Sequence, residues 1–262
     1  MQTGAYSRDQ SGIMGLLNKD TFVCFDCEAT GLDPEKDRII EIAAAKFTFD
    51  GILESREDLI NPGILIPQHT IEIHHITDDM VRGKPSMKEV LKDYLDFIGD
   101  SIVVGHAIPF DLAILDNEAK RANVGSSLLK QRHLDTLRLA RLYGESPTNS
   151  LESLRKHFNI KAEGAHRAMS DVLVNIEVFK HLSRKFKTTE EILKRLEKPI
   201  ALKLMPLGKH KGRPFREVPI EYLRWAANQD FDQDLLFSLR SELKKRRHGN
   251  QFSQAANPFS EL

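Results

Sequence analysis

An α/β domain with a mixed sheet flanked by helices, followed by a small α+β module, is the fold that the sequence predicts. Two observations support the prediction. Three short apolar runs follow one another near the N-terminus, and a later apolar run has amphipathic stretches before and after it. Apolar runs separated by turn residues are typical of an antiparallel meander. Strands that alternate with helices indicate an α/β sheet, in which binding residues gather at the strand ends.

The three apolar runs predict three consecutive strands. Gly31 and Pro34 interrupt the chain after the first run, Gly51 marks a tight turn after the second, and Asn-Pro-Gly at 61–63 ends the third. The expected strands are 21–27, 38–49 and 52–60.

Helical patterns follow these strands. After a loop that carries His74 and His75, Ser86 precedes apolar residues at helical spacing, which predicts an amphipathic helix. A fourth strand is expected at 101–105, and Pro109 stands near the start of the helix after it. Three later helices are expected, at 135–143, 150–158 and 168–186.

The chain is expected to form a main domain with a smaller appendage. The module is expected to contain a strand at 202–207 and helices at 219–229 and 232–247, while the polar residues after it predict disorder. The expected segments are a flexible N-terminal segment at 1–19, the main domain at 20–186, a linker helix at 187–200, the module at 201–247 and a disordered tail at 248–262.

Composition limits the class of protein. Net charge is zero, with 38 basic and 38 acidic residues, and the apolar content of 40% is ordinary for a globular chain. No apolar run approaches the roughly 18 residues of a membrane helix, and residues 1–20 lack the apolar stretch of a signal peptide. The two cysteines are too few to crosslink a fold of this size. A reducing, cytoplasmic setting without a membrane partner is therefore expected.

Acidic residues beside apolar runs are the strongest indication of chemistry. Asp26 and Glu28 lie two apart on a predicted strand, so both side chains leave the same face, and a charge inside an apolar run is costly without a partner. Asp111 and Asp171 each fall in the first turns of a predicted helix. Taken singly, these residues could be solvated or helix-capping acids. Held together they would repel one another unless cations lay between them, which predicts Mg²⁺ or a similar hard cation.

His166 precedes Asp171 by five residues and is expected on the loop that enters the last helix of the main domain. There it could reach a bound water, and the alternative is a histidine of a surface loop.

Three segments carry a resemblance to a known family. FDCEATGL at 25–32, GHAIPFD at 105–111 and HRAMSD at 166–171 resemble the motifs of DnaQ-like 3′–5′ exonucleases, and the H-x4-D spacing is similar to that of their DEDDh branch. The resemblance extends over about residues 20–185 and implies a ribonuclease H-like fold. Three alanine or cysteine residues depart from the common motifs without removing an acid or the histidine: Cys27, Ala29 and Ala107.

The resemblance implies that the chain hydrolyses phosphodiester bonds with two Mg²⁺ or Mn²⁺ ions per active site. One ion would activate a water whose proton His166 accepts, and the other would stabilise the leaving 3′-oxygen, giving a nucleoside 5′-monophosphate. The implied metal ligands are Asp26, which bridges the ions, Glu28, Asp111 and Asp171. The residues expected to bind the terminal nucleotide are Ala29, Thr30, Gly31, Leu32, His106 and Phe110. An apolar wedge among them would favour unpaired 3′ ends.

Basic residues concentrate in the C-terminal module. Between 203 and 216 there are five lysines or arginines and no acid, and the segment 204–226 resembles the small domain that follows the exonuclease domain in exonuclease X-like proteins. Tyr222 and Trp225 either offer a stacking platform or dock the module on the main domain. Nucleic-acid binding is expected at Lys209, His210, Lys211 and Arg213, because glycines between them let the backbone approach phosphates.

The leading functional hypothesis is a stand-alone exonuclease that acts on single-stranded or frayed 3′ ends of DNA in repair or end processing. A proofreading subunit of a replicative polymerase and an exonuclease that trims RNA 3′ ends remain alternatives, as does a non-catalytic nucleic-acid adaptor. The segment at 233–237 loosely resembles a sliding-clamp-binding pentapeptide and equally fits the apolar stripe of a helix.

Overall fold

The computed structural model describes residues 17–143, 146, 148–161 and 167–255, and the chain divides into two compact units, 1–195 and 196–262. The boundary between the units falls inside the segment expected as a linker, 187–200. Of the N-terminal segment that was expected to be flexible, residues 1–16 lie outside the described residues, and Leu17–Lys19 form a short 3₁₀ helix.

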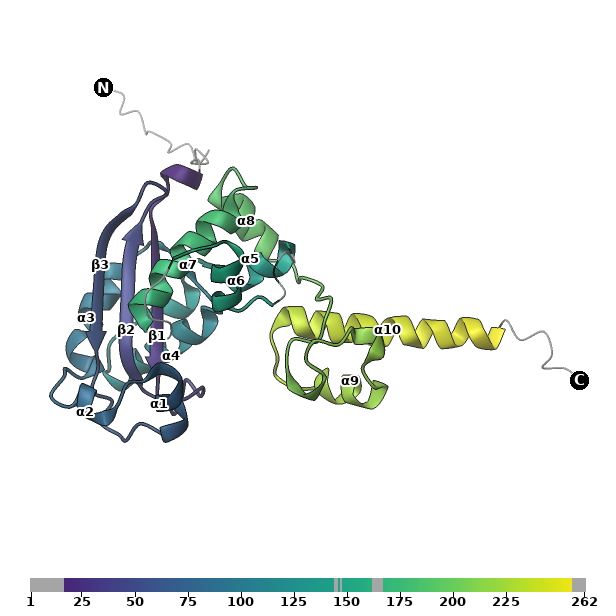
Figure 1. The fold of residues 1–262 in the computed structure, drawn as a ribbon, viewed down its shortest axis with the longest axis horizontal. Coiled ribbons are helices and arrows are strands. Elements are labelled where there is room, and N and C mark those ends of the chain that lie inside the picture. Colours follow the sequence, from purple (N-terminus) through teal and green to yellow (C-terminus); the bar gives the residue numbers. More distant parts are fainter. Residues whose placement is uncertain (1–16, 144–145, 147, 162–166, 256–262) are drawn as a thin grey trace, which may run out of the picture. The chain divides into compact units, whose positions relative to one another are not determined.

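The first unit is built on a mixed sheet of five strands in the order β3-β2-β1-β4-β5. Figure 1 labels the first three strands of this order, β3, β2 and β1. The strands are β1 Phe22–Ala29, β2 Ile39–Phe47, β3 Ile52–Leu59, β4 Ile102–Gly105 and β5 His133–Asp135. The first three form the predicted antiparallel meander, whereas β4 pairs in parallel with β1 and with β5. The mixed sheet is thus confirmed. The strand β5 was not predicted, because three residues are too few to show a period of two.

Eight helices are described in or at the edge of this unit. They are α1 Gln68–His74, α2 Asp78–Val81, α3 Met87–Ile98, α4 Pro109–Arg121, α5 Thr136–Tyr143, α6 Leu151–His157, α7 Ala168–Ser183 and α8 Thr189–Leu196. The segment expected as a loop around His74 and His75 contains α1 and α2. Ile71 of α1 and Val81 of α2 pack in a small apolar cluster with Ile40 of β2, which holds both short helices against the strand.

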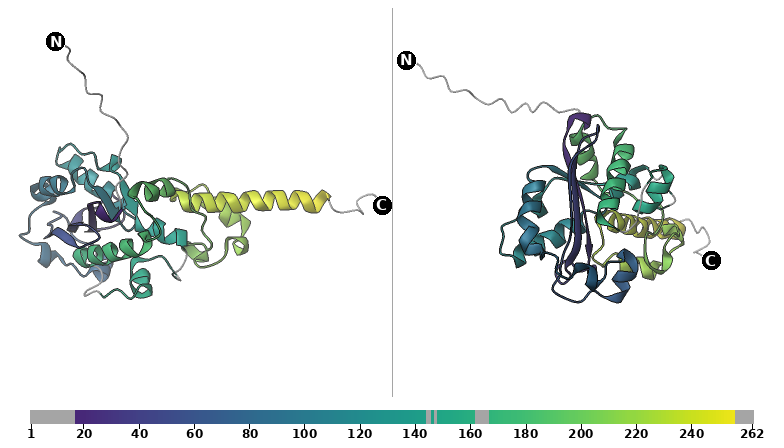
Figure 2. Two further views of the ribbon diagram at one scale, coloured as in Figure 1. Left: turned by 90° about the horizontal axis from the view of Figure 1, so that it is seen from above. Right: turned by 60° about the vertical axis from the view of Figure 1, so that its left-hand side comes forward.

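Helices cover both faces of the sheet, as the right-hand view of Figure 2 shows with blue α3 and green α7 on opposite sides. Phe22 of β1 packs on Phe179 of α7, with ring centroids 5.2 Å apart. The neighbouring residues Val23 and Phe25 belong to the core that includes residues of α3 and α4. Because side chains alternate along a strand, Asp26 continues the face of Phe22 and projects toward the α7 side.

The second unit has its own apolar core, formed by Met205, Phe215, Val218, Leu223, Ala226, Leu235 and Leu239. Its helices are α9 Ile220–Ala226 and α10 Gln233–Ala255. An isolated bridge between Leu204 and Pro214 replaces the strand expected at 202–207. Within the described ranges, no helix has the length and apolar character needed to cross a membrane.

Helix α10 continues past Arg247, so the disordered tail expected from residue 248 is wrong as far as Ala255. The sequence has no proline between Pro219 and Pro258, and the helix therefore meets no obligatory break at its predicted end. Residues 256–262 lie outside the described residues. The clamp-like pentapeptide forms the first turns of α10 with Leu235 fully buried, which favours its interpretation as an apolar helix stripe.

Candidate active site

Asp26 and Glu28 stand at the end of β1, where the strand leaves the core. The strand is buried from Phe22 to Phe25, and both acids are only partly buried on the face that α7 covers. Ala43 of β2 lies opposite Asp26 in the register, and a small side chain there leaves space beside the carboxylate. The strand therefore delivers two carboxylates, side by side, to the edge of the core.

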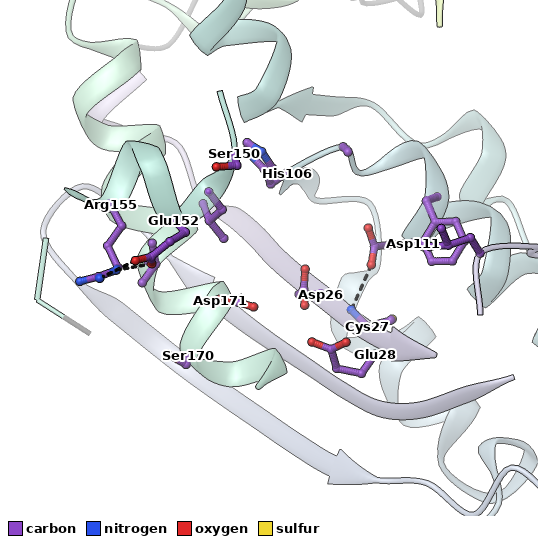
Figure 3. A pocket seen from close by; sticks show the side chains of 15 residues that line it. Asp26, Cys27, Glu28, His106, Asp111, Ser150, Glu152, Arg155, Ser170 and Asp171 are labelled. Atoms are coloured by element: carbon purple, nitrogen blue, oxygen red, sulfur yellow. Dashed lines mark hydrogen bonds and ion pairs between the residues drawn. The ribbon is translucent and has the colours of Figure 1, made fainter. Parts of the chain in front are cut away.

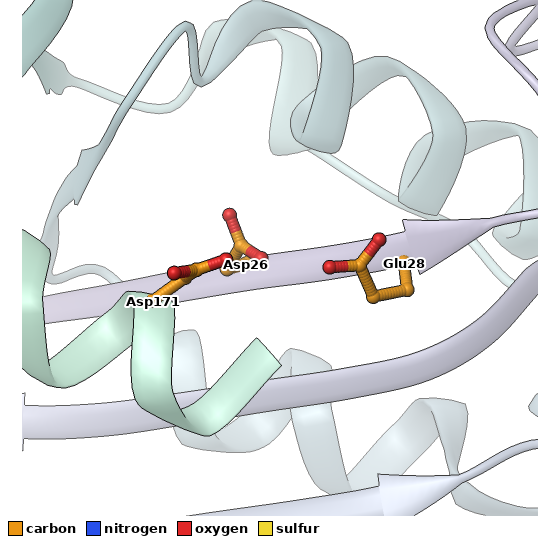
Figure 4. Close-up of side chains that lie close together, drawn as sticks. All are labelled: Asp26, Glu28 and Asp171. Carbon is orange, nitrogen blue, oxygen red and sulfur yellow. The ribbon is translucent and has the colours of Figure 1, made fainter. Parts of the chain in front are cut away.

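Helix α7 brings a third carboxylate to the same place. Asp26, Glu28 and Asp171 each place a carboxylate oxygen within 4.8 Å of the others. In Figure 4 the side chain of Asp171, at the start of the helix, points toward the strand that carries the other two. The geometry thus brings Asp171 together with the two acids of β1, from which it is distant in sequence.

Asp111 lines the same cavity from the first turn of α4 but lies outside that 4.8 Å group. The residue is 5% exposed, and its Oδ1 accepts a hydrogen bond of 3.0 Å from the backbone N–H of Cys27 (Figure 3). This bond ties α4 to β1 between the two acids of the strand. It fixes the position of Asp111 relative to Asp26 and Glu28.

Burial and mutual repulsion raise the proton affinity of these acids. Burial, followed by the charges of Asp171 and Glu41, raises the pKa of Asp26 to about 7. Burial and then the charge of Asp26 raise the pKa of Glu28 to about 8. Burial and the charge of Asp26 also raise the pKa of Asp111 well above its ordinary value. A divalent cation would relieve this repulsion, and a set of carboxylate oxygens is the donor set that Mg²⁺ and Mn²⁺ prefer.

A cavity of about 530 Å³ opens over the carboxylates. Leu32, 89% exposed, stands at its wall, and α6 adds Glu152 and Arg155, which pair with each other through an Nε–Oε2 distance of 2.7 Å. The α6 residues were not anticipated from the sequence. The residues that line the cavity are Asp26, Cys27, Glu28, Leu32, His106, Ala107, Phe110, Asp111, Ser150, Leu151, Glu152, Arg155, Ser170, Asp171 and Val174.

The residues expected to bind the terminal nucleotide separate into two groups. Leu32, His106 and Phe110 line the cavity. Thr30 is buried and supports the loop instead, because its hydroxyl donates to Asp37 at 2.9 Å and accepts from the backbone N–H of Arg38 at 3.0 Å. A Cβ on Gly31 would lie 2.4 Å from Asp37, so glycine permits this close packing. Ala29 is the last residue of β1 and is half-buried.

His106 and Ala107 form the turn between β4 and α4. Burial lowers the pKa of His106 to about 4, so the ring is neutral at physiological pH, and its Nδ1 lies 3.0 Å from Thr136 Oγ1. Ala107 has a left-handed backbone with φ of 58°, and its N–H donates to Asp135 Oδ1 at 3.0 Å. Asp135 also accepts from the N–H of Leu137 at the start of α5. Asp135 therefore links the turn to α5, a role that was not predicted from the sequence.

Glu41 of β2 positions the helix that carries Asp171. Its side chain is fully buried, pairs with the Arg167 guanidinium and accepts a hydrogen bond of 2.9 Å from the backbone N–H of Ala168, the first residue of α7. Glu41 was not predicted from the sequence to have this role. It had the same signal as Asp26, an acid inside an apolar run. The predicted base His166 belongs to 162–166, outside the described residues.

Comparisons with known proteins agree with this geometry. The family profile described as Exonuclease matches residues 23–179. The DNA polymerase III subunit epsilon of Aquifex aeolicus (strain VF5) is 35% identical over 160 residues, which are 61% of this chain and 78% of that protein. The PolC-type DNA polymerase III of Bacillus subtilis (strain 168) is 38% identical over 157 residues, 60% of this chain and 11% of that one.

Solved structures share the fold. Exonuclease X in complex with 5′ overhanging duplex DNA superposes with a TM-score of 0.54 at 22% identity, covering 66% of this chain and 98% of that one. Escherichia coli exonuclease I in complex with a dA16 oligonucleotide gives a TM-score of 0.57 at 21% identity, and the match covers 68% of this chain and 43% of that one. A second profile, described as Putative quorum-sensing-regulated virulence factor, matches residues 191–241.

The chain belongs to the exonuclease family and is a DnaQ-like 3′–5′ exonuclease with the ribonuclease H-like sheet of that family. It spans most of the epsilon subunit, but only about a tenth of the PolC-type polymerase and less than half of exonuclease I. The resemblance drawn from the three sequence motifs is thereby confirmed.

Proposed function

We propose that this protein removes nucleoside 5′-monophosphates from the 3′ ends of DNA, with two Mg²⁺ or Mn²⁺ ions held by Asp26, Glu28, Asp111 and Asp171. One observation carries the proposal: three carboxylates approach within 4.8 Å of one another inside the cavity of a chain that belongs to the exonuclease family. Such a cluster costs stability when it is empty, and hydrolysis of a phosphodiester is the chemistry that bound cations would serve there.

The chain's own residues prepare the site. Bound ions would supply the positive charge that activates a water and stabilises the leaving oxygen. The strand β1 holds Asp26 and Glu28 rigidly, the pair of Glu41 with Arg167 anchors the helix of Asp171, and the N–H of Cys27 orients Asp111. His166 is proposed as the base that accepts the proton of the attacking water.

The exposed Leu32 favours unpaired 3′ ends as the substrate. Its side chain stands at the cavity wall with 89% of its surface exposed, a position in which it can pack on a terminal base. A base at a duplex end must unstack before it reaches such a contact, and single-stranded or frayed ends avoid this cost. DNA rather than RNA is supported by the DNA-bound states of exonuclease X and exonuclease I, whose fold this unit shares.

Hydrolysis of oligonucleotides labelled at the 3′ or the 5′ end tests the proposal. Parallel DNA and RNA strands are incubated with Mg²⁺, Mn²⁺ or EDTA, using the natural chain, Asp26→Ala and the control Asp50→Ala, which alters an exposed acid. Stepwise release of mononucleotides from the 3′ end, lost in EDTA and in Asp26→Ala but kept in the control, is the expected result. Intact DNA in the presence of either metal would contradict the proposal, and preferential RNA degradation would establish the RNA alternative.

A second candidate is the proofreading subunit of a replicative DNA polymerase. It is favoured by the similarity to the epsilon subunit, of which this chain covers 78%. The chemistry would be the same and the difference would lie in an obligate polymerase partner. Co-purification of the tagged full chain from its own cells, followed by identification of any DNA polymerase, separates this candidate from the stand-alone enzyme.

A further inference from the structure

Two aromatic side chains form a pair on the surface of the second unit. Tyr222 and Trp225 lie three residues apart on α9, so they project from neighbouring positions of one helix face. Their ring centroids are 5.2 Å apart with an interplanar angle of 47°, and Trp225 is 51% exposed. The unit has its own apolar core, in which Leu223 and Ala226 are the buried residues of α9. Much of the Trp225 ring is therefore left outside that core.

Uncompensated positive charge lies beside the aromatic pair. Lys209 Nζ stands 5.2 Å from the centroid of the Tyr222 ring, and Lys211 and Arg213 are exposed on the same loop. In the part of the chain that the structure describes, none of these three side chains forms an ion pair with a carboxylate. No carboxylate of the described residues neutralises these charges, and they remain available to an anionic ligand.

The loop that presents these charges has a defined backbone conformation. Gly208 and Gly212 on either side of the lysines adopt positive φ values of 71° and 81°. Backbone hydrogen bonds of 2.8 Å connect Met205 N–H to Arg213 O and Gly212 N–H to Met205 O. A Cβ on Gly208 would lie 2.4 Å from the Tyr222 hydroxyl, so the loop approaches α9 more closely than another residue would permit.

His210, expected from the sequence to contact nucleic acid, is only 9% exposed. Its ring packs edge-on against Tyr222, with centroids 4.6 Å apart and an interplanar angle of 78°. The His210 side chain therefore supports the ring of Tyr222 and is too buried to contact a ligand. This corrects the prediction that His210 binds nucleic acid.

We propose that Tyr222, Trp225, Lys209, Lys211 and Arg213 form a binding surface for single-stranded nucleic acid, separate from the catalytic cavity. Bases stack on the aromatic pair, and the basic side chains contact the backbone phosphates. Unpaired bases expose the ring faces that stacking requires, whereas bases in a duplex are already stacked on one another. An acidic peptide would satisfy the charges but not the two adjacent rings, so nucleic acid is the better match. This binding does not depend on the proposed exonuclease activity.

Binding by the full chain tests this inference. The probes are fluorescein-labelled oligo(dT) and oligo(U) of equal length and a blunt DNA duplex, measured by anisotropy in EDTA so that no strand is cleaved. Trp225→Ala is expected to weaken single-strand binding about tenfold, and Trp225→Phe to restore most of the loss, because stacking needs a ring. Lys209→Ala with Lys211→Ala is expected to lower the slope of log affinity against log salt by about 1–2.

Matched controls lie in the same unit. Phe237→Ala removes another exposed aromatic ring and Lys244→Ala with Lys245→Ala removes two other exposed lysines, and both are expected to leave affinity unchanged. The comparison of oligo(dT) with oligo(U) identifies DNA or RNA as the preferred strand. Thermal unfolding of each variant checks the fold, and the double lysine variant decides the matter if Trp225→Ala proves unstable, since both lysines are exposed.

The inference would be overturned if Trp225→Ala and the double lysine variant both kept the affinity of the natural chain, or if the control variants lost as much affinity. An equal loss of affinity for single strands and for the duplex would also overturn it. So would displacement of the strand by poly-glutamate combined with an affinity that Trp225→Ala does not change. Hydrolysis of the p-nitrophenyl ester of thymidine 5′-monophosphate with Mg²⁺ is measured in parallel and reports only the catalytic cavity. A natural chain that binds oligo(dT) through Trp225 but leaves both this ester and the labelled DNA strands intact would refute the proposed exonuclease function without affecting the binding surface.

Discussion

Glu41 and Arg167 form an ion pair that joins β2 to the start of α7, the helix that carries Asp171. Arg167 Nε donates to Glu41 Oε1 at 2.9 Å, and the second carboxylate oxygen accepts from the N–H of Ala168 at 2.9 Å. The two residues are 126 positions apart in sequence. The pair therefore fixes the start of α7 against β2, the strand that pairs with β1, where Asp26 and Glu28 lie.

Glu41→Ala is expected to lower the free energy of unfolding by about 2–3 kcal/mol, because it removes the buried partner of an ion pair and leaves the N–H of Ala168 without its acceptor. Arg167 is 41% exposed, which moderates the loss because water can solvate the remaining charge. Urea denaturation measures the change, and nuclease activity is expected to fall at least about tenfold because Asp171 moves. Glu54→Ala, which removes an exposed partner of Arg56, is the control, and equal stability of the two variants would contradict the prediction.

The stability of the metal-free protein is expected to fall as the pH rises. The pKa values of Asp26 and Glu28 are raised from 3.8 and 4.5 to about 7 and about 8 in the folded chain. Between those limits the folded state holds more protons than the unfolded state, so stability declines with increasing pH. Mg²⁺ must displace these protons, and its affinity should rise over the same range. The Tm increase caused by Mg²⁺ should therefore be larger at about pH 8.5 than at about pH 6, and the opposite order would refute the assignment.

Asp111→Asn is expected to lower the nuclease activity and to raise the unfolding free energy of the metal-free protein. The amide oxygen can still accept the hydrogen bond from Cys27 N–H, while the buried charge that repels Asp26 disappears. In EDTA near neutral pH the variant should gain on the order of 1 kcal/mol in unfolding free energy, and its nuclease activity should fall at least about a hundredfold. Calorimetry and the labelled-strand assay measure the two effects. Asp50→Asn should change neither, and an active Asp111→Asn enzyme would exclude this residue from the catalytic centre.

Ala107→Gly is expected to stabilise the protein by about 0.5–1 kcal/mol. Ala107 has a φ of 58°, a left-handed conformation that costs an alanine about 1 kcal/mol and costs glycine little. Its hydrogen bond to Asp135 uses the backbone N–H and survives the substitution. Ala122→Gly, at a residue with a φ of −80°, is the matched control and should be destabilising when both are compared by urea denaturation. Destabilisation of both variants by the same amount would show that Ala107 is not strained.

Local patterns in the sequence were sufficient for the elements that display a clear period. The apolar runs predicted β1 to β4, and the spacing of Asp26 and Glu28 placed both on one face, because alternation along a strand is a property of the backbone alone. The motif resemblance likewise pointed to Asp111 and Asp171 as members of the site.

Only the tertiary structure determined how these elements meet. The three residues of β5 become a strand by pairing with β4, and α1 and α2 are held in place by Ile71 and Val81, which pack in the cluster of Ile40 of β2. The positioning of α7 by Glu41, and the burial of His210 beneath Tyr222, depend on partners that are remote in the chain or brought close by a turn. A sequence pattern reports which face a side chain occupies, whereas the identity of the atoms across that face is decided by long-range packing.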